Sequence, residues 1–480
     1  MTAAGTSSNG AHSFPQGFIW GAATAAYQIE GAATADGRGV SIWDTFSRQP
    51  GKVRGGDTGD VACDSYHRYP EDVALMSSFG LTNYRFSISW PRVQPGGRGP
   101  VNQKGLDYYK ALLDELVSKG ISPAVTLYHW DLPQELQDGG GWAVRSTAGR
   151  FAEYAALVAE QLGDRVSRWI TVNEPQVVAS HGYRDGVHAP GLRDDAAAAA
   201  ATHYLLLGHG LATQALRSVH PATPVGITLD MHPVRVPSGV QPDVVEQARA
   251  ITDAEVNGIF LEPVLHGRYP AHARASLLPE PSLLVDGDLE TINQPIDFLG
   301  VNYYAPVYIR GGDPDDLRRN EEPADCGVPG VVEYRPAELE RTAMGWLVDP
   351  DGLYDLLVRL SKEAPGLPLY ITENGCAAED YVNQQGTVND LERVSYLHKH
   401  LDAAARAIQA GVNLAGYYVW SLLDNFEWGW GYQKRFGIVY VDFETQRRIP
   451  KSSARFYSEV ARANAIPPLA ANGPSAAGGG

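Results

Sequence analysis

Eight short apolar runs, each followed by a helical pattern, limit the possible folds of this chain more than any other feature. The runs are rich in β-branched and aromatic residues, and amphipathic stretches separate them. They begin at Phe18, Thr82, Ser122, Arg168, Val225, Ile296, Pro368 and Leu414. Strands that alternate with helices pair in parallel through right-handed crossovers, and eight such units can close into a ring. The sequence therefore predicts an α/β fold, a single (β/α)₈ TIM barrel with its active site at the C-terminal ends of the strands.

Two of the intervening stretches show the helical pattern clearly. Residues 103–120 end at a glycine and carry apolar side chains at spacings of three and four, namely Leu106, Tyr109, Leu112, Leu113 and Leu116. Residues 194–220 open on two aspartates, which suit a helix N-terminus. We therefore interpret the alanine run that follows them as helix and not as a linker.

The 480 residues could form two or three ordinary domains or one large barrel. No linker composition separates the runs, which favours one catalytic domain over residues 14–465. Residues 1–13 and 466–480 are rich in Gly, Ala, Ser and Pro and are predicted to be disordered tails. The longer inserts, near residues 30–65 and 311–346, are predicted to be loops at the rim.

Composition argues against several classes of function. The formal charge of −17, without any run of Lys or Arg, argues against a nucleic-acid partner. No stretch of about 18 apolar residues and no secretory signal pattern occurs, so no membrane partner is expected. The odd set Cys63, Cys326 and Cys376 fits reduced thiols in the cytoplasm. No cluster with metal-ligand spacing and no phosphate-binding loop is found, so neither a metal nor a cofactor is expected.

Polar and large aromatic side chains stand where the runs end, which in a barrel is the functional face. They are Gln28, Trp90, His129, Trp130, Asn173, Glu174, His232, Asn302, Tyr304, Glu373, Asn374 and Trp420. Amides, carboxylates and imidazoles can bond sugar hydroxyls, and an indole can stack on the C–H face of a sugar ring. The pattern indicates a carbohydrate pocket.

Two runs end on a carboxylate, Glu174 in "TVNEP" and Glu373 in "YITENG". Paired carboxylates suit acetal cleavage, because one donates a proton to the leaving oxygen while the other attacks or stabilises the anomeric carbon. A separation of roughly 5 to 5.5 Å implies retention, and one of roughly 6.5 to 9.5 Å implies inversion. The residues alone leave this choice open.

Several conspicuous residues have a structural interpretation. Trp90 and Trp169 are expected to be core residues. His398 and His400 lie two positions apart in a helical stretch and point apart, so they are not expected to bind a metal. His181, His188 and His232 are assigned no role.

Segments spread in order from Phe14 to about Ser453 resemble those of family 1 glycoside hydrolases, the β-glucosidase family. They read "FPQGFIWGAATAAYQIEGA", "YRFSISWPR", "TLYHWDLPQ", "TVNEP", "GVNYY", "YITENG", "SLLDNFEW" and "RFGIVYVDFETQRRIPKSS". The resemblance implies a single (β/α)₈ barrel and hydrolysis of β-glycosides with net retention. It implies that Glu174 is the acid/base and Glu373 the nucleophile, and that Arg85 and Tyr304 support the nucleophile.

The resemblance also implies which residues bind the substrate. Trp420 would stack on the ring, Asn173 would contact the 2-hydroxyl, and Trp346 would be a platform for a second sugar. Other substrate-binding residues would be Gln28, His129, Trp130, Asn302, Tyr304, Glu427 and Trp428.

Four positions bear on specificity within the resemblance. Relatives that cleave 6-phosphosugars carry Ser and Lys where this chain has Glu427 and Trp428, so an unphosphorylated sugar is favoured. Plant thioglucosidases carry Gln at the position of Glu174, so an O-glycosidase is favoured. Gln176 replaces the usual aromatic residue, and Cys376 replaces a small apolar one. Leaving-group preference therefore stays open.

The resulting prediction is a retaining β-glucosidase that acts on cellobiose, short cello-oligosaccharides and aryl or alkyl β-glucosides. Side activity on β-galactosides and β-fucosides, and transglycosylation, are expected as well. The partner is thus a small β-glucoside, and both a monomer and a homo-oligomer stay open. The alternatives are a transglycosylase with the same residues, an idle sugar-binding barrel, and a metal-dependent barrel hydrolase.

Overall fold

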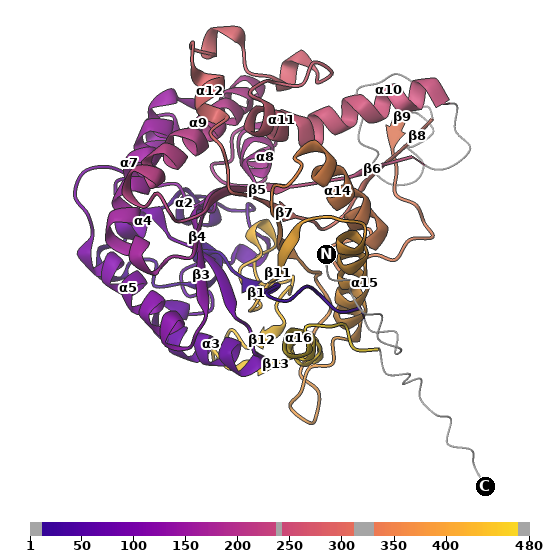
Figure 1. Ribbon diagram of the computed structural model, residues 1–480. Helices are drawn as coiled ribbons and strands as arrows, with labels where there is room; N and C mark the ends of the chain where they lie inside the picture. Colours follow the sequence, from indigo (N-terminus) through magenta and orange to yellow (C-terminus); the bar gives the residue numbers. More distant parts are fainter. Residues whose placement is uncertain (1–11, 237–241, 312–330, 469–480) are drawn as a thin grey trace.

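A computed structural model describes residues 12–236, 242–311 and 331–468. A closed ring of parallel strands lies at its centre, with helices around it (Figure 1). In ring order the strands are β1 (Ile19–Ala23), β11 (Leu414–Trp420), β10 (Leu369–Asn374), β7 (Phe298–Asn302), β5 (Val225–Asp230), β4 (Arg168–Asn173), β3 (Ser122–Tyr128) and β2 (Asn83–Ser87). The predicted eight-stranded barrel is confirmed, and each predicted run contains one of its strands.

The first and last strands close the ring. β1 pairs in parallel with β11, from Ile19 opposite Gly416 to Ala23 opposite Trp420. The strand ends at Ala23, earlier than the predicted run, and the chain then enters the short helix α1 (Ala26–Ile29). Gln28 was predicted at a strand end and lies instead in this helix, so that part of the prediction was wrong.

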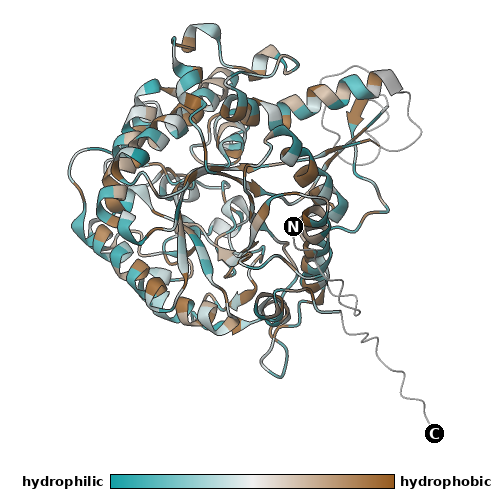
Figure 2. Ribbon diagram, viewed as in Figure 1, coloured by the Kyte–Doolittle hydropathy of each residue, from teal (hydrophilic) through white to brown (hydrophobic). Residues whose placement is uncertain are grey.

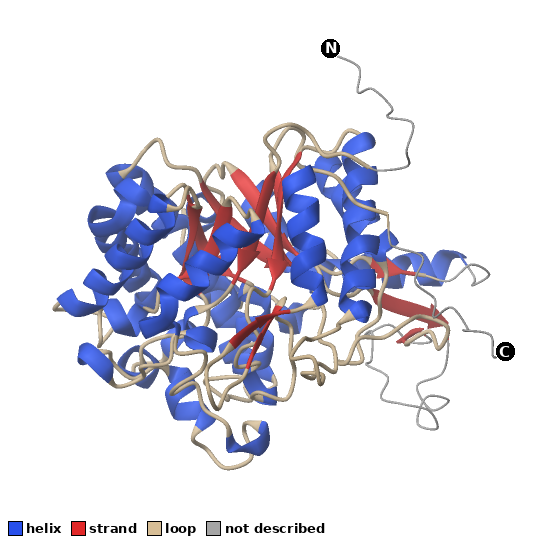
Figure 3. Cartoon of the chain, turned by 90° about the horizontal axis from the view of Figure 1, so that it is seen from below, coloured by secondary structure: helices blue, strands red, loops and turns tan. Residues whose placement is uncertain are grey.

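The long helices lie outside the strands, as the view from below in Figure 3 also shows. They are α3 (Ser65–Phe79), α5 (Gln103–Ser118), α7 (Arg145–Leu162), α9 (Asp195–Val219), α10 (Pro242–Asp253), α11 (Ile259–His266), α14 (Pro350–Glu363), α15 (Leu391–Gln409) and α16 (Ser452–Ala463). Shorter α-helices are α2 (Ile42–Ser47), α4 (Trp90–Val93), α6 (Gln134–Asp138), α8 (Pro175–Val177) and α12 (Asp288–Ile292).

The two helices predicted from the sequence are both present. α5 buries its apolar residues at spacings of three and four against the barrel, including Leu106 and Leu116. α9 begins after Asp194, whose side chain accepts a hydrogen bond from the Ala197 amide and so caps the helix. The surrounding helices carry both hydrophilic and hydrophobic residues, as Figure 2 shows, which is expected for helices that pack one face on a core.

The predicted rim inserts contain more regular structure than expected. The insert near residues 30–65 contains α2. In the second insert, residues 331–333 form β9 (Val331–Glu333), which pairs with β8 (Val307–Gly311), and β8 in turn pairs with β6 (Val234–Arg235). The loop prediction was wrong there, and residues 312–330 lie outside the described part. A separate hairpin consists of β12 (Val439–Val441) and β13 (Arg448–Pro450).

Trp90 and Trp169 are fully buried, as their structural interpretation required. Trp90 lies in the first turn of α4 and stacks on Tyr154, with ring centroids 4.7 Å apart. Across the described residues, no helix is both long and apolar enough to cross a bilayer.

The first and last described residues lie close to each other. Ser13 pairs with Ala465, and the Ile466 amide donates to the His12 carbonyl, so regular contacts extend past the predicted domain limits of residues 14 and 465. The remainder of the predicted tails, residues 1–11 and 469–480, lies outside the described residues.

Candidate active site

A cavity of about 820 Å³ opens at the C-terminal ends of the barrel strands. Its wall contains many of the predicted site residues, namely His129, Trp130, Glu174, Tyr304, Trp346, Glu373, Trp420, Glu427 and Trp428. Arg85, Asn173 and Asn302 lie buried behind this wall and bond to one another or to wall residues. Gln28 is also buried, and its side chain bonds to Asn425 and Phe426. The structure thus brings together side chains from strands far apart in the sequence.

Three residues of the cavity wall have left-handed backbone conformations that non-glycine residues rarely adopt. Trp130 has φ of +79°, and Glu174 and Trp428 each have φ of +47°. Such conformations cost free energy and persist where the surrounding structure fixes them, commonly at functional sites. In each case the chain has just left a strand or entered a turn, so the unusual φ redirects the side chain at the rim.

Glu373 is held by two donors. Arg85, fully buried on β2, donates from Nη1 to Glu373 Oε1 at 2.6 Å. The Tyr304 hydroxyl donates to Glu373 Oε2 at 2.7 Å. Burial raises the pKa of Glu373, while the Arg85 cation and the Tyr304 hydrogen bond act in the opposite direction. Both donors therefore favour the ionised carboxylate.

Glu174 is in different surroundings. Its Oε1 accepts a hydrogen bond from Asn302 Nδ2 at 2.6 Å, and among the described residues no cation bonds to it directly. Burial raises the pKa of Glu174 well above its ordinary value, and the negative charge of Glu373 raises it further. Glu174 therefore keeps a proton under conditions in which Glu373 has lost its own.

A chain of hydrogen bonds links the two glutamates. Asn302 Nδ2 also lies 3.2 Å from Asn173 Oδ1, and that oxygen accepts a hydrogen bond from Arg85 Nη2 at 2.5 Å. Arg85 then reaches Glu373. Because these partners are all buried, they fix the orientation of both carboxyl groups relative to each other.

The predicted sugar-binding side chains include acceptors that have no protein partner. Gln28 donates from Nε2 to Asn425 Oδ1 and to the Phe426 carbonyl, but its Oε1 is buried without a partner. Glu427 Oε2 is also buried without a partner, and burial together with Glu373 raises the pKa of Glu427 to about 8. Acceptors of this kind suit hydroxyl donors.

The imidazole of His129 lies between polar and aromatic neighbours. Asn173 Nδ2 lies 3.1 Å from its Nε2, and burial keeps the pKa of His129 well below its ordinary value, so the ring is neutral. The Trp420 and Trp428 rings lie nearly parallel to it, with centroids 5.9 Å and 6.1 Å away. Trp346 packs edge-on against Tyr304 at 5.4 Å.

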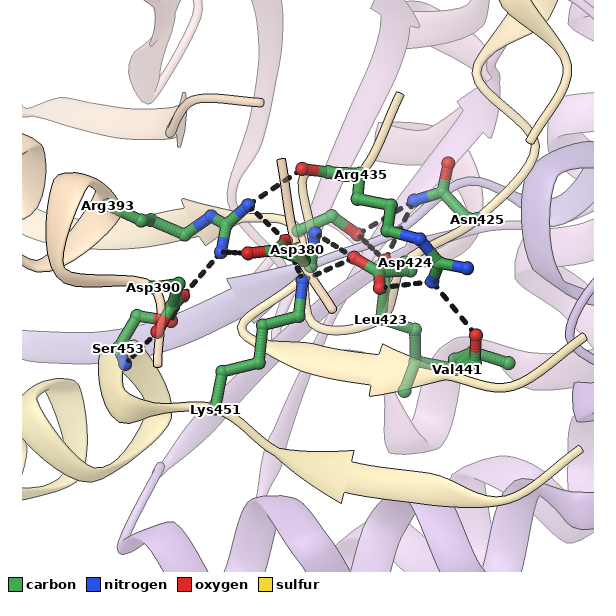
Figure 4. A network of polar contacts seen from close by, with 12 residues as sticks. Asp380, Asp390, Arg393, Leu423, Asp424, Asn425, Arg435, Val441, Lys451 and Ser453 are labelled. Carbon is green, nitrogen blue, oxygen red and sulfur yellow. Dashed lines mark hydrogen bonds and ion pairs between the residues drawn. The ribbon is translucent and has the colours of Figure 1, made fainter. Parts of the chain in front are cut away.

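A buried ion network anchors the segment that carries Glu427 (Figure 4). Lys451 Nζ lies 2.6 Å from both Asp424 and Asp380, Arg435 pairs with Asp424 at 2.7 Å, and Arg393 pairs with Asp380 at 2.8 Å. Asp424 precedes Glu427 by three residues, so the network fixes this segment from behind. Sequence reasoning missed this network, because Lys451 and Asp380 lie 71 residues apart and nothing in the residue spacing shows that they meet.

A second missed feature lies beside Gln176. Asp230 at the end of β5 lines the cavity and pairs with His232, to which no role had been assigned. Gln176 donates from Nε2 to the Asp230 carbonyl at 2.7 Å. His181 and His188 also line the cavity.

The cysteines lie apart from this chemistry. Cys63 and Cys376 are buried free thiols, and burial raises the pKa of Cys376 to about 12. Cys376 is therefore a protonated, inert neighbour of the Glu373 segment. Cys326 lies outside the described residues. Among the residues that the structure describes, no group of three or more His, Cys, Asp or Glu side chains could hold a metal ion.

Comparison with known proteins assigns the family. The family model described as Glycosyl hydrolase family 1 matches residues 10–466. The chain belongs to glycosyl hydrolase family 1. The resemblance noted in the sequence is thereby confirmed, and the barrel is the fold of the solved family 1 structures it matches.

Family 1 relatives align along most of their length. The thermostable β-glucosidase B of Thermobispora bispora is 51% identical over 468 residues, covering 97% of this chain and 94% of the relative. A bifunctional β-D-glucosidase/β-D-fucosidase of Bifidobacterium breve is 45% identical, covering 92% of this chain and 97% of the relative. The structure of a Thermotoga maritima β-glucosidase in complex with deoxynojirimycin superposes with a TM-score of 0.86 at 46% identity, covering 94% of this chain and 99% of that one.

Proposed function

We propose that this family 1 chain is a retaining β-glucosidase that releases terminal β-D-glucosyl residues from cellobiose, short cello-oligosaccharides and aryl or alkyl β-glucosides. The observation that carries the proposal is the pair of buried glutamates at one cavity, of which Glu174 holds its proton more strongly than Glu373. Burial raises the pKa of both, but Arg85 and Tyr304 favour the ionised form of Glu373, whereas the charge of Glu373 raises the pKa of Glu174 further.

In the first step of the proposed mechanism, a Glu373 oxygen attacks the anomeric carbon. The bond from that carbon to the leaving oxygen breaks, and Glu174 gives its proton to this oxygen. The products are the released alcohol, a glucosyl ester on Glu373 and an ionised Glu174. Because the ester carries no negative charge, the force that kept Glu174 protonated is weakened, and Glu174 becomes a base.

In the second step, Glu174 takes a proton from water, whose oxygen attacks the anomeric carbon and displaces Glu373. Two inversions give net retention. A sugar hydroxyl can replace water in this step, and the product is then a longer glycoside. Retention is supported by the donors fixed on Glu373, which suit a carboxylate that attacks directly, and by the family.

For the sugar, we propose the residues named from the sequence. Gln28 and Glu427 each present an unpartnered buried oxygen, Asn173 is aligned by Arg85, and Trp420 offers a ring face. Glu427 would repel a phosphate whenever it is ionised, which favours an unphosphorylated sugar. Side activity on β-fucosides is suggested by the bifunctional relative.

Substrates of this kind place the activity at the last stage of cellulose degradation. A cytoplasmic location is part of the proposal, because Cys63 and Cys376 are free thiols. Cell fractionation followed by an assay with an aryl β-glucoside would test it, and activity confined to the medium would contradict it.

The central test is to trap the intermediate. The protein is incubated with 2,4-dinitrophenyl 2-deoxy-2-fluoro-β-glucoside, digested and analysed by mass spectrometry, with Glu373→Gln as the control. The expected adduct lies on the peptide that contains Glu373 and is missing in the variant. An adduct on another residue, or steady turnover without any adduct, would overturn the nucleophile assignment.

A further inference from the structure

Asp230 and His232 form a charged pair beside the proposed acid/base. Asp230 Oδ2 lies 2.9 Å from His232 Nε2, and His232 Nδ1 lies 2.9 Å from the Ala305 carbonyl. Both ring nitrogens thus face an acceptor. A neutral imidazole has a single N–H donor, so only the protonated ring satisfies both partners. The geometry assigns a positive charge to His232 and a negative charge to Asp230.

The pair is built into the same framework as Glu174. The Glu174 amide donates to the Thr228 carbonyl on β5, two residues before Asp230. Asp230 is also the register partner of Asn302 on β7, whose side chain donates to Glu174. The side chain of Asp230 is 13% exposed, and its Oδ1 is buried without a partner, so one carboxylate oxygen has no local donor.

Asp230 stands between two cavities. It lines the catalytic cavity together with Glu174, and it lines a neighbouring cavity of about 210 Å³ together with His232 and Gln176. Asp230 lines both cavities, and His232 lines the smaller one. In this arrangement the negative end of the pair is the one that shares a wall with Glu174.

Other charged groups face the pair from the surrounding elements. Glu373 on β10, with Arg85 on β2, lies across the catalytic cavity, and Glu333 on β9 lies on the His232 side. From the π-helical turn of residues 178–184, His181 lines both cavities. Glu255, which also lines the smaller cavity, is paired with Arg274.

The electrostatic effects agree in direction with the geometry. Burial opposes a charge on His232, but Asp230, the Ala305 carbonyl and Glu333 together outweigh it and raise the pKa of His232 to about 9. After burial and Glu373, Asp230 is the next group that raises the pKa of Glu174. His232 partly neutralises Asp230 and thereby limits that effect.

We propose that Asp230 and His232 are positioning residues whose ion pair controls the proton on Glu174 and so sets the alkaline limit of the acid-catalysed step. This inference rests on the proposed function of Glu174. It gives a role to Asp230 and His232, to which the proposed mechanism assigns no contact with the substrate.

The test uses the dependence of kcat/KM on pH with cellobiose, whose poor leaving group needs the proton from Glu174. Asp230→Asn removes the negative neighbour and is expected to move the alkaline limb down by about one pH unit, whereas His232→Gln exposes that charge and is expected to move it up by about one unit. In Asp230→Asn/His232→Gln the limb is expected to follow the single Asp230→Asn variant.

Two controls separate this effect from loss of structure. His67→Gln changes an exposed histidine whose Nδ1 lies 2.6 Å from Asp64 Oδ1. His67 does not line the catalytic cavity, so no shift of the alkaline limb is expected. With 2,4-dinitrophenyl β-glucoside, whose leaving group needs no proton, the limb is expected to stay in place in every variant.

Shifts in the same direction for the two single variants, no shift in either, or equal shifts with the dinitrophenyl substrate would overturn the inference. If His232→Gln does not fold, His232→Asn replaces it, and the direction of the Asp230→Asn shift alone still decides. Failure of the proposed function is distinct, because the unmodified protein would then release no glucose from either substrate.

Discussion

Glu174 and Glu373 are chemically identical side chains that the fold places in different electrostatic surroundings. Glu373 accepts hydrogen bonds from the Arg85 guanidinium and the Tyr304 hydroxyl, and Glu174 accepts one from the Asn302 amide. The difference arises from neighbours on β2 and β7 and not from the glutamates themselves. This difference between the two glutamates can be tested by replacing Glu174, the proposed proton donor, or Tyr304, a single neighbour of Glu373.

Replacing Glu174 by Ala removes the proposed proton donor. Cleavage of cellobiose is expected to fall by about 10³-fold, within the range of general acid catalysis. Release of 2,4-dinitrophenol from its β-glucoside is expected to lose far less in the glycosylation step, which pre-steady-state measurements isolate. Equal losses with both substrates would contradict the acid role of Glu174.

Replacing Tyr304 by Phe removes one donor from Glu373. The pKa of Glu373 is expected to rise, so the acidic limb of kcat/KM should move to higher pH by about one to two units, since a hydrogen bond to a charged group contributes about 1.5 to 3 kcal/mol. Tyr303→Phe is the matched control, because that hydroxyl donates to the Asp349 carbonyl. An unmoved acidic limb in Tyr304→Phe would refute the support assigned to Tyr304.

At this scale the sequence was informative where a rule links position to function. Glu174 directly follows β4 and Glu373 lies near the end of β10, and barrel strands end at the site. Asp230 is the last residue of β5, but its pairing with His232 depends on the Ala305 carbonyl, which β7 brings alongside. Such a contact has no signature in residue spacing, so His232 could not be assigned from the sequence.

Among the helices, two glycines show how packing overrides local propensity. Gly210 lies within α9, and a Cβ atom there would meet the Thr291 carbonyl oxygen at 1.9 Å. Gly149 lies within α7, and a Cβ atom there would meet nothing within 4 Å. Helix propensity alone would favour alanine at both positions.

Gly149→Ala is therefore expected to stabilise the protein by about 0.5 to 1 kcal/mol, and Gly210→Ala to destabilise it by about 1 to 3 kcal/mol through overpacking. Urea denaturation followed by circular dichroism measures both. A Gly210→Ala variant at least as stable as the unmodified protein would show that the packing assigned to α9 is wrong, and a destabilised Gly149→Ala variant would contradict the open space assigned to α7.

Elements with strong local periodicity were predictable, and those that depend on distant partners were not. α5 follows from its apolar spacing. β9 forms because it pairs with β8, and nothing in residues 331–333 alone requires a strand. Similarly, the chain from Phe18 to Gln28 reads as one apolar run, and the switch from β1 to α1 follows from contacts with other parts of the barrel, such as the Ala26 amide to Ser87 Oγ.

Across the whole molecule, buried carboxyl groups couple stability to pH. Asp131, which follows Trp130, is fully buried, and burial raises its pKa from 3.8 to about 8, although Ser89 acts in the opposite direction. The folded state therefore binds a proton that the unfolded state releases above pH 4. The contribution of Asp131 to stability should therefore fall as pH rises from about 4 to about 8 and then level off.

Asp131→Asn should remove this contribution, which has a slope of about 1.4 kcal/mol per pH unit. Relative to the unmodified protein, the variant should gain stability as pH rises over that interval. Urea denaturation at a series of pH values measures the slope, with the exposed Asp107→Asn as the control. A slope unchanged by Asp131→Asn would show that Asp131 is ionised in the folded protein.

The seam between β1 and β11 has a consequence for synthesis. Ala23 lies beside Trp420, and Lys451, near the C-terminus, anchors the segment of Glu427. A chain emerging from a ribosome therefore lacks a finished catalytic face until almost its whole length has been translated. Glucose release during cell-free translation should appear only with full-length product. The time at which activity appears would then report when β11 has paired with β1.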